Sequence, residues 1–340
     1  MSAAGGRMHV ERSALFLFGE AIGYTYAAAL RAAAAIGVAD HMADEPRDVA
    51  SLAADVGCDV AGLRRVLRML AARGIVAAEG SDRFRLSAAG SALRTDSPKS
   101  ARSGILMLTD DMFWNTSHVV AETIRAKDPS FASIVGCTLA EYFESDPAKA
   151  ALFYDGMEAV SGAENQLVAS ACELPDSGTV ADIGGRYGGF LRAVLEIRPS
   201  LRGVLFDKPD EVVKHRLTPA SVANRVDVVG GDFFVAVPPA DVYLLKRIIH
   251  NYDDDQSVRI LENCRRAMRA NGRVLVIDAI PPPDPRPHDS KAMDFMMLGA
   301  LTGGERTAAE LEPLIARAGL QLCRVLPTCT PMSVVVAEAV

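Results

Sequence analysis

An acidic residue directly precedes a glycine-rich segment in the second half of the chain. Residues 180–189 read VADIGGRYGG, with Asp182 two positions before the first glycine, Gly184, which Gly185 follows. Glycine lets the backbone turn tightly and lets a ligand approach closely, because no Cβ stands in the way. A carboxylate at this position attracts an ammonium group and repels a pyrophosphate. The spacing also departs from the G-x-G-x-x-G of dinucleotide-binding folds, which disfavours a nicotinamide-dependent dehydrogenase.

Two further acidic residues follow at the ends of the next predicted strands. Asp207 closes the run GVLFD, 25 residues after Asp182, and Asp232 stands in GGDFF before Phe233. A carboxylate in the first position can accept hydrogen bonds from both hydroxyls of a ribose. The second offers an acceptor for an exocyclic adenine amine beside an aromatic ring. Any single aspartate could merely cap a helix, but the three in succession predict an adenosine ligand without phosphates.

A histidine lies at the mouth of the same predicted sheet. The segment ADVYLLKRIIHNYDDDQ ends a strand, and Asp253 with Gln256 forms a capping box for the next helix. His250 precedes that cap and is not explained by it. A lone histidine is more often structural, but its place beside a ligand site favours a function. Its unperturbed pKa of about 6.5 suits a base that acts near neutral pH.

The elements that position these residues change character along the chain. From residue 177 to 340, short β-rich runs alternate with helices, which predicts an α/β, Rossmann-like domain with a mainly parallel sheet. Residues 1–100 contain predicted helices and a two-stranded ribbon near Glu79 to Asp82, the pattern of a winged helix. Residues 101–176 are predicted to form a helical linker with large apolar side chains that contributes to an acceptor pocket.

The arginines of the predicted winged helix have two interpretations. Arg64, Arg65, Arg68 and Arg73 lie on or just after its third helix, which could read a DNA major groove. The same helices could instead serve dimerisation, with the arginines solvated. The net charge of -7 and the interspersed acids favour dimerisation and disfavour a nucleic-acid partner. A DNA-binding regulator that senses the nucleoside stays as the alternative.

Composition restricts the class of protein further. With 340 residues, 49% of them apolar and 23% charged, the chain has the profile of a globular protein of two domains. It has no unbroken run of 18 apolar residues and no cleavage-site pattern, so neither a membrane span nor a signal peptide is predicted. The six cysteines are scattered without a C-x-x-C pair, which is typical of reduced thiols in the cytoplasm.

Six motifs, taken in order, resemble those of one known family. DIGGRYGGFL, LFDKPD, GGDFF, ADVYLLKRIIHNYDD, GRVLVIDAIPP and GGERTAAEL are similar to the motifs of the S-adenosylmethionine-dependent O-methyltransferases of the plant caffeate type and their bacterial natural-product relatives. The resemblance covers nearly the whole chain. It implies an enzyme that uses S-adenosyl-L-methionine to methylate a hydroxyl of a small aromatic metabolite, as in antibiotic biosynthesis. It also implies a homodimer formed through the winged helix.

The same resemblance implies roles for individual residues. His250 corresponds to the general base, and Asp278 and Glu305 correspond to two acidic residues that hold it. The family often has glutamate in the place of Asp278, so this side chain is one methylene shorter. The acceptor pocket corresponds to Phe153, Met157 and Asn251. The cofactor contacts correspond to Ser161, Asp182, Gly184, Gly185, Asp207, Asp232, Phe233 and Lys246.

Simple chemistry is consistent with these roles. A phenol that resembles tyrosine has a pKa of about 10, so a base is needed to form the nucleophilic phenolate at neutral pH. A positioned base typically contributes about 10² to 10⁴ in rate. The sequence has no cluster spaced for Mg²⁺ or Zn²⁺, and no metal is predicted. N- or C-methylation, or another reaction of the same cofactor, stays as the alternative within the fold.

Overall fold

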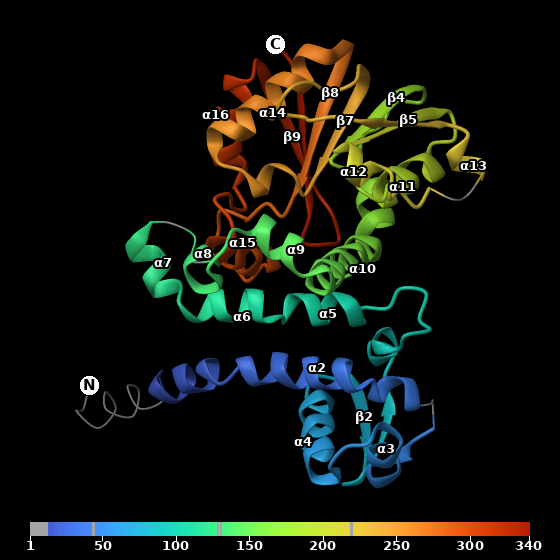
Figure 1. Ribbon diagram of the computed structural model, residues 1–340, viewed down its shortest axis with the longest axis vertical. Coiled ribbons are helices and arrows are strands. Elements are labelled where there is room, and N and C mark those ends of the chain that lie inside the picture. The colour runs from blue at the N-terminus through green and yellow to red at the C-terminus, as the bar shows by residue number, and fades with distance from the viewer. Residues whose placement is uncertain (1–12, 43–44, 128, 130, 218–219) are drawn as a thin grey trace, which may run out of the picture. The chain divides into compact units, whose positions relative to one another are not determined.

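The chain divides into two compact units. The computed structural model describes residues 13–42, 45–127, 129, 131–217 and 220–340. The first unit comprises the described residues up to Asp110 together with Leu152–Ala159, and the second comprises Asp111–Ala151 and Val160–Val340. Helix α10 (Pro147–Ala171) contributes to both units (Figure 1). The segment 101–176 is therefore shared between them.

The first unit packs short helices against a three-stranded antiparallel sheet. Asp48 and Asp59 cap two of these helices, since each side chain accepts hydrogen bonds from backbone N–H groups two or three residues further on. Leu63, Leu67 and Leu70 are buried in the core, as their helical spacing predicts. In chain order the unit contains α2 (Tyr24–Ile36), η1 (Val38–His41), β1 (Arg47–Asp48), α3 (Val49–Val56), α4 (Val60–Ala71), β2 (Val76–Glu79), β3 (Arg83–Leu86), η2 (Gly90–Leu93) and α5 (Arg102–Leu108).

The predicted ribbon of the first unit is present as a hairpin. Strands β2 and β3 pair in antiparallel register from Val76 opposite Leu86 to Glu79 opposite Arg83. β1 pairs with the other edge of β3. The turn of the hairpin contains Gly80, whose φ of 67° lies in the left-handed region that favours glycine.

An exposed apolar helix begins the described chain. The helical span Ser13–Ile36 has a length and apolar composition that would allow it to cross a membrane. The side chains of residues 15–18 are 62–68% exposed. Further along the same span, Arg31 donates a hydrogen bond to the carbonyl oxygen of Leu106 at 2.7 Å. The helix is thus tied to α5, while its exposed apolar end marks a surface that another molecule could cover.

The second unit is built on a seven-stranded sheet with helices on both faces (Figure 1). The strand order is β6-β5-β4-β7-β8-β10-β9, in which the strands from β6 to β8 run parallel and β10 is antiparallel to both neighbours. This is the predicted α/β architecture. The strands are β4 (Gly178–Ile183), β5 (Leu201–Asp207), β6 (Val226–Gly230), β7 (Ala240–Lys246), β8 (Met268–Asp278), β9 (Leu320–Pro327) and β10 (Ser333–Ala339). The helical elements besides α10 are α6 (Asp111–His118), α7 (Val120–Ala126), α8 (Phe131–Val135), α9 (Leu139–Ser145), α11 (Gly189–Ile197), α12 (Pro209–Val212), α13 (Ala220–Ala223), η3 (Ile249–Asn251), α14 (Asp254–Ala267), α15 (Asp289–Ala300) and α16 (Ala308–Arg317).

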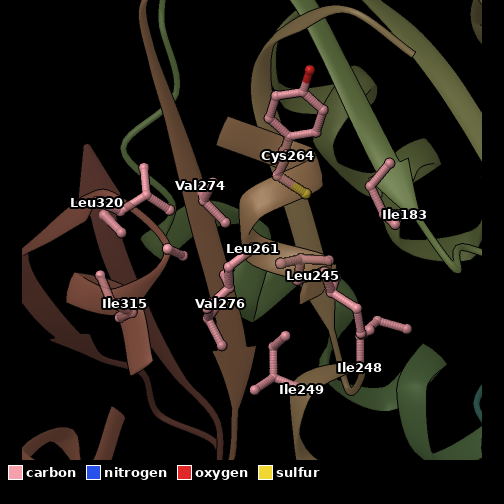
Figure 2. Packing of buried hydrophobic residues seen from close by; sticks show 14 of the residues in the cluster. Ile183, Leu245, Ile248, Ile249, Leu261, Cys264, Val274, Val276, Ile315 and Leu320 are labelled. Carbon is pink, nitrogen blue, oxygen red and sulfur yellow. The ribbon is translucent and has the colours of Figure 1, made fainter. Parts of the chain in front are cut away.

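Alternate side chains of the central strands face two separate cores. On β7, Leu245 belongs to the core that includes Leu261 of α14 and Ile315 of α16, which Figure 2 shows from close by. Its neighbour Leu244 belongs to the core on the opposite face, together with Leu191 of α11. Successive strand residues point to opposite faces of a sheet, and both faces are covered here. The strands are therefore almost continuously hydrophobic until they reach their carboxyl ends.

The turn that carries His250 is anchored on both sides. Ile248 and Ile249 are buried in the core shown in Figure 2. Burying such a side chain contributes about 1.5–3 kcal/mol. After the turn, Asp253 and Gln256 form the predicted capping box at the start of α14. The position of the imidazole is therefore set by packing before it and by a helix cap after it.

The order of the strands reverses between β4 and β7. From β4 the chain adds β5 and then β6 on one side, and it then returns to place β7 on the other side of β4. In open α/β sheets, ligands bind beyond the carboxyl ends of the strands at such a reversal. Asp182 near the end of β4, Asp207 at the end of β5 and Lys246 at the end of β7 lie at this edge.

Candidate active site

Two glycines of the turn after β4 have no room for a side chain. Gly184 has a φ of 71°, and a Cβ there would lie 2.5 Å from Cδ1 of Ile248. A Cβ on Gly185 would lie 2.5 Å from Oδ2 of Asp182. Both distances are far shorter than real Cβ contacts, so both positions require glycine.

Asp182 is a buried carboxylate with unused hydrogen-bonding capacity. The residue is 2% exposed, and its Oδ2 has no hydrogen-bond partner among the described residues. Burial raises the pKa of this carboxyl to about 7, although the ammonium group of Lys246 opposes the rise. A buried acceptor without a donor costs free energy. The site therefore suits a ligand that brings a cationic donor such as an amino group.

Asp207 is oriented by the backbone on two sides. Its Oδ2 accepts a hydrogen bond from the N–H of Arg186 at 2.9 Å, and its Oδ1 accepts one from the N–H of Lys208 at 2.7 Å. Burial raises the pKa of the carboxyl, and these two bonds oppose the rise. Each carboxylate oxygen has a second lone pair. The group can therefore still accept hydrogen bonds from two ribose hydroxyls.

Asp232 and Phe233 follow the end of β6 and form a more open site than Asp207. Asp232 is exposed, and its Oδ1 accepts a hydrogen bond from the N–H of Phe234 at 2.8 Å. Phe233 is partly buried, with its ring centroid 5.0 Å from that of Phe234 and 5.8 Å from that of Tyr252. This cluster offers an apolar aromatic surface beside an acid, as contact with a purine would require.

Lys246 is enclosed by polar groups of α10. Its Nζ donates to Oγ of Ser161 at 2.5 Å and lies 2.9 Å from Oε1 of Glu164. Burial lowers the pKa of this ammonium group, and the negative charge of Glu164 opposes the change. The predicted residues Ser161 and Lys246 are thus direct neighbours. The sequence does not indicate Glu164, because nothing distinguishes it from other acids on a helix.

The three residues predicted for proton transfer lie together. His250 stands on η3 and is 7% exposed, and its Nδ1 lies 2.8 Å from Oε1 of Glu305. Asp278 ends β8 and is also buried. Burial by itself would lower the pKa of the imidazole, but the charges of Asp278 and Glu305 raise it above its usual value. Burial raises the pKa of Asp278 to about 6, against the attraction of the imidazole.

The hydrogen bond to Glu305 determines which imidazole nitrogen can act as a base. A carboxylate accepts, so Nδ1 of His250 carries the proton and Nε2 is left with a lone pair. Ligand atoms of His250, Asp278 and Glu305 also lie within 4.8 Å of one another, close enough to surround an ion. The hydrogen bond between Nδ1 and Oε1 already joins two of these three side chains. The absence of a metal stays a prediction.

The segment that carries Glu305 is held directly against η3. Gly303 packs on the carbonyl oxygen of His250, and a Cβ there would overlap with it. Arg306 donates to two carbonyl oxygens of the same turn, at 3.3 and 2.8 Å. From α15, Asp294 accepts a hydrogen bond from the N–H of Glu305 at 2.9 Å. The motif GGERTAAEL contains Gly303 and Arg306, but their packing on His250 cannot be read from the sequence.

The residues predicted to contact the acceptor belong to different units. Asn251 follows His250 directly, and its Nδ2 donates to the carbonyl oxygen of Arg247 at 2.8 Å. Phe153 and Met157 lie on the part of α10 that belongs to the first unit. Asn251 lies next to His250 in the same turn, and the roles of Asn251, Phe153 and Met157 stay predictions.

Two cavities adjoin the segment before Glu305. Their volumes are about 260 and about 430 Å³, and both are lined by Leu298 and Gly303. The larger cavity falls within the size range of sites for small organic ligands. Its other lining residues are Thr123, Ile124, Lys127, Pro129, Leu301 and Thr302.

Comparison with known proteins agrees with this arrangement. The model of an O-methyltransferase domain matches residues 117–321, and the model of an O-methyltransferase dimerisation domain matches residues 20–96. The chain belongs to the O-methyltransferase family. The resemblance noted in the sequence is thereby confirmed, and with it the methyltransferase fold, the transferase class and S-adenosylmethionine as the cofactor. The glycine turn and the unpaired Oδ2 of Asp182 fit this cofactor, which carries an amino group and no phosphate.

Proteins of known function and structure align with this O-methyltransferase over most of its length. The crystal structure of CalO1, a methyltransferase in calicheamicin biosynthesis in its SAH-bound form, is 56% identical, covers 97% of this chain and 98% of its own, and has a TM-score of 0.93. Phenazine O-methyltransferase PhzM of Lysobacter antibioticus is 35% identical over 94% of each chain. The mitomycin biosynthesis 6-O-methyltransferase of Streptomyces lavendulae is 33% identical over 88% of this chain and 87% of its own.

Proposed function

We propose that this O-methyltransferase methylates a hydroxyl group of a small aromatic metabolite and that His250 is its general base. The observation that carries the proposal is the buried pair of His250 and Glu305, with Asp278 beside it. Two carboxylates around one imidazole increase its affinity for a proton. A base of this kind is what a hydroxyl acceptor needs before it can attack a methyl group.

Residues at the strand ends hold the cofactor in this proposal. Asp182 and the turn at Gly184 and Gly185 receive the methionine end, and Asp207 binds the ribose. The adenine lies against Phe233 near Asp232, and Lys246 with Ser161 completes the nucleoside pocket. When bound, S-adenosylmethionine supplies an electrophilic methyl group on a cationic sulfur.

Proton transfer is the task of His250. Its Nε2 accepts the proton of the acceptor hydroxyl, and the positive charge that forms on the imidazole is stabilised by Glu305 and Asp278. Burial strengthens these interactions, because charges attract one another more in a medium of low dielectric constant. Asp278 supplies its charge from the end of a strand, one methylene short of the glutamate that the family often has.

A pocket for a flat aromatic acceptor is consistent with the surroundings of the base. We assign Asn251, Phe153 and Met157 to contacts with the acceptor, as the family resemblance implies. The cavity of about 430 Å³ beside Gly303 is lined by none of these three residues, and its volume lies in the range of sites for small organic ligands. The name of the phenazine O-methyltransferase refers to an aromatic ring system. Aromatic hydroxyl compounds are therefore the first acceptors to test.

Mass spectrometry of reaction mixtures tests the proposal most simply. The purified enzyme is incubated with S-adenosylmethionine and a panel of phenolic and hydroxylated polycyclic metabolites, with aromatic amines as matched controls. We expect a gain of one CH₂ group on hydroxyl compounds and none on amines. Methylation confined to nitrogen or carbon would refute the O-methyltransferase assignment.

We also propose that the protein is a cytoplasmic homodimer formed through a winged helix in the first unit. The dimerisation model matches residues 20–96, and the apolar side chains of residues 15–18 are exposed in a single chain. A second copy would remove this surface from water, which stabilises association. The double substitution Phe16→Glu and Phe18→Glu should turn a dimer into monomers in analytical ultracentrifugation. A monomeric wild-type protein, or one that floats with lipid vesicles, would contradict this proposal.

A further inference from the structure

Arg247 lies where three elements meet, between the end of β7 and the turn that carries His250. Its backbone N–H donates to the carbonyl oxygen of Ile277 on β8 at 3.0 Å. Its own carbonyl oxygen accepts a hydrogen bond from Nδ2 of Asn251 at 2.8 Å. Its guanidinium group reaches Glu164 on α10. The backbone N–H, the carbonyl oxygen and the guanidinium group of Arg247 therefore contact three different elements.

The backbone of Arg247 adopts a conformation that side chains disfavour. Its φ is 56°, in the left-handed region. A residue other than glycine stays there only when its surroundings hold it, and such positions cluster at functional sites. This conformation redirects the chain from β7 into η3, and it thereby sets the direction in which His250 leaves the sheet.

Glu164 is the group that holds the Arg247 side chain. One oxygen, Oε1, lies 3.2 Å from Nε and 3.0 Å from Nη2 of Arg247, and 2.9 Å from Nζ of Lys246. The exposed fractions of these side chains are 7% for Glu164, 10% for Arg247 and 4% for Lys246. Two buried cations thus share one buried carboxylate. Removing one member of such a group leaves an uncompensated charge.

We propose that the Glu164–Arg247 ion pair is a positioning device for His250: it fixes the turn between β7 and η3 and keeps a compensated charge beside the imidazole. Glu164 and Arg247 act through His250 and are positioning residues. The expected effect of Glu164 and Arg247 on the rate of turnover rests on the proposed role of His250 as the base. Their effect on the pKa of the imidazole can be measured without turnover.

The charges around His250 determine the sign of each expected effect. Asp278 from β8 and Glu305 from the segment before α16 raise the pKa of the imidazole, and Arg247 lowers it. Arg306 contacts the carbonyl oxygens of the same turn and adds a second nearby cation. Removing the Arg247 charge should therefore raise the pKa of His250. Removing the anion that compensates Arg247 should lower it.

Titration of His250 by NMR tests the proposal directly. The full chain is labelled at its six histidines, and the His250 signal is identified by its loss in the variant His250→Gln. We expect Glu164→Gln to lower the pKa of His250 and Arg247→Gln to raise it, each by roughly half a pH unit or more. The double variant should return it close to the wild-type value. The acid limb of the pH–rate profile should move in the same directions.

Controls separate this proposal from a purely structural role. Glu196→Gln removes an exposed acid of the same unit and should leave the titration unchanged. Arg247→Lys keeps the charge but loses the paired N–H groups, so it should reduce turnover with little change in the pKa of His250. If Arg247→Gln does not fold, the change in the pKa of His250 in Glu164→Gln decides whether the proposal holds. Shifts in the same direction in both variants, or no shift, would overturn the proposal. Undiminished turnover in His250→Gln would instead refute the general base and leave these shifts standing.

Discussion

The proposed cofactor end and the proposed base end of this site are built in different ways. Asp182 and Asp207 lie at the ends of neighbouring strands and are placed by the sheet, and two backbone N–H groups further orient Asp207. His250 lies on a turn held by Glu305 and Gly303, which are distant in sequence. The first end is a direct product of the parallel sheet. The second depends on long-range contacts, so we expect it to be more easily disrupted.

The largest effect should come from removing the base. His250→Ala should lower kcat by about 10² to 10⁴, because the variant loses the proposed general base. Binding of S-adenosylhomocysteine, measured by calorimetry, should stay close to that of the wild type, since the cofactor residues lie on the strands. Equal losses of turnover and of S-adenosylhomocysteine binding in His250→Ala would show that the two ends of the site do not act independently.

A smaller loss of activity, accompanied by a loss of stability, should follow from adding a methyl group at Gly303. In Gly303→Ala the new Cβ would overlap the carbonyl oxygen of His250, so the segment before Glu305 must move away. We expect a lower melting temperature and a strong decrease in kcat. Gly162→Ala on α10 is the matched control, because a Cβ there meets nothing within 4 Å. A Gly303→Ala enzyme with full activity would disprove the tight packing of this segment on the turn.

Substitutions at the strand ends should affect binding more than turnover. Asp207→Asn should weaken S-adenosylhomocysteine binding by roughly tenfold or more, because a charged acceptor of two hydrogen bonds is lost. Asp232→Asn should have a smaller effect, since this side chain is exposed and keeps its bond to the N–H of Phe234. Calorimetry at one pH compares the two. The reverse order would contradict the assignment of the ribose to Asp207.

The weakest expected effect is a pH dependence of cofactor binding that originates at Asp182. The pKa of Asp182 is raised from 3.8 to about 7 in the folded protein, so the folded state holds this proton more tightly than the unfolded state does. The contribution of Asp182 to folding stability is therefore lost as the pH rises through about 7. A ligand amino group prefers the ionised form. Binding of S-adenosylhomocysteine should therefore tighten a few-fold from about pH 6 to about pH 8, and Asp182→Asn should remove this dependence. Binding that weakens as the pH rises would contradict the proposed contact between ionised Asp182 and the ligand amino group.

The same contrast explains how much the sequence could predict. Parallel strands end at one edge, so the aspartates in VADIGG, GVLFD and GGDFF could be placed together, and the capping box at Asp253 identified where α14 begins. The positive φ of Arg247 and the pairing of its side chain with Glu164 have no local signature. Both depend on which helix packs over the strand ends, and that is decided by tertiary contacts. The motif around Glu305 indicated the residue but not the overlap that makes Gly303 necessary.

The most direct test of the account is a crystal structure of the enzyme with S-adenosylhomocysteine and a methylatable acceptor. We predict that Nε2 of His250 lies within hydrogen-bond distance of the acceptor hydroxyl oxygen, about 2.6–3.2 Å, with Nδ1 still bonded to Glu305. An acceptor oxygen held by another side chain, with the imidazole out of reach, would contradict the assignment of His250 as the base.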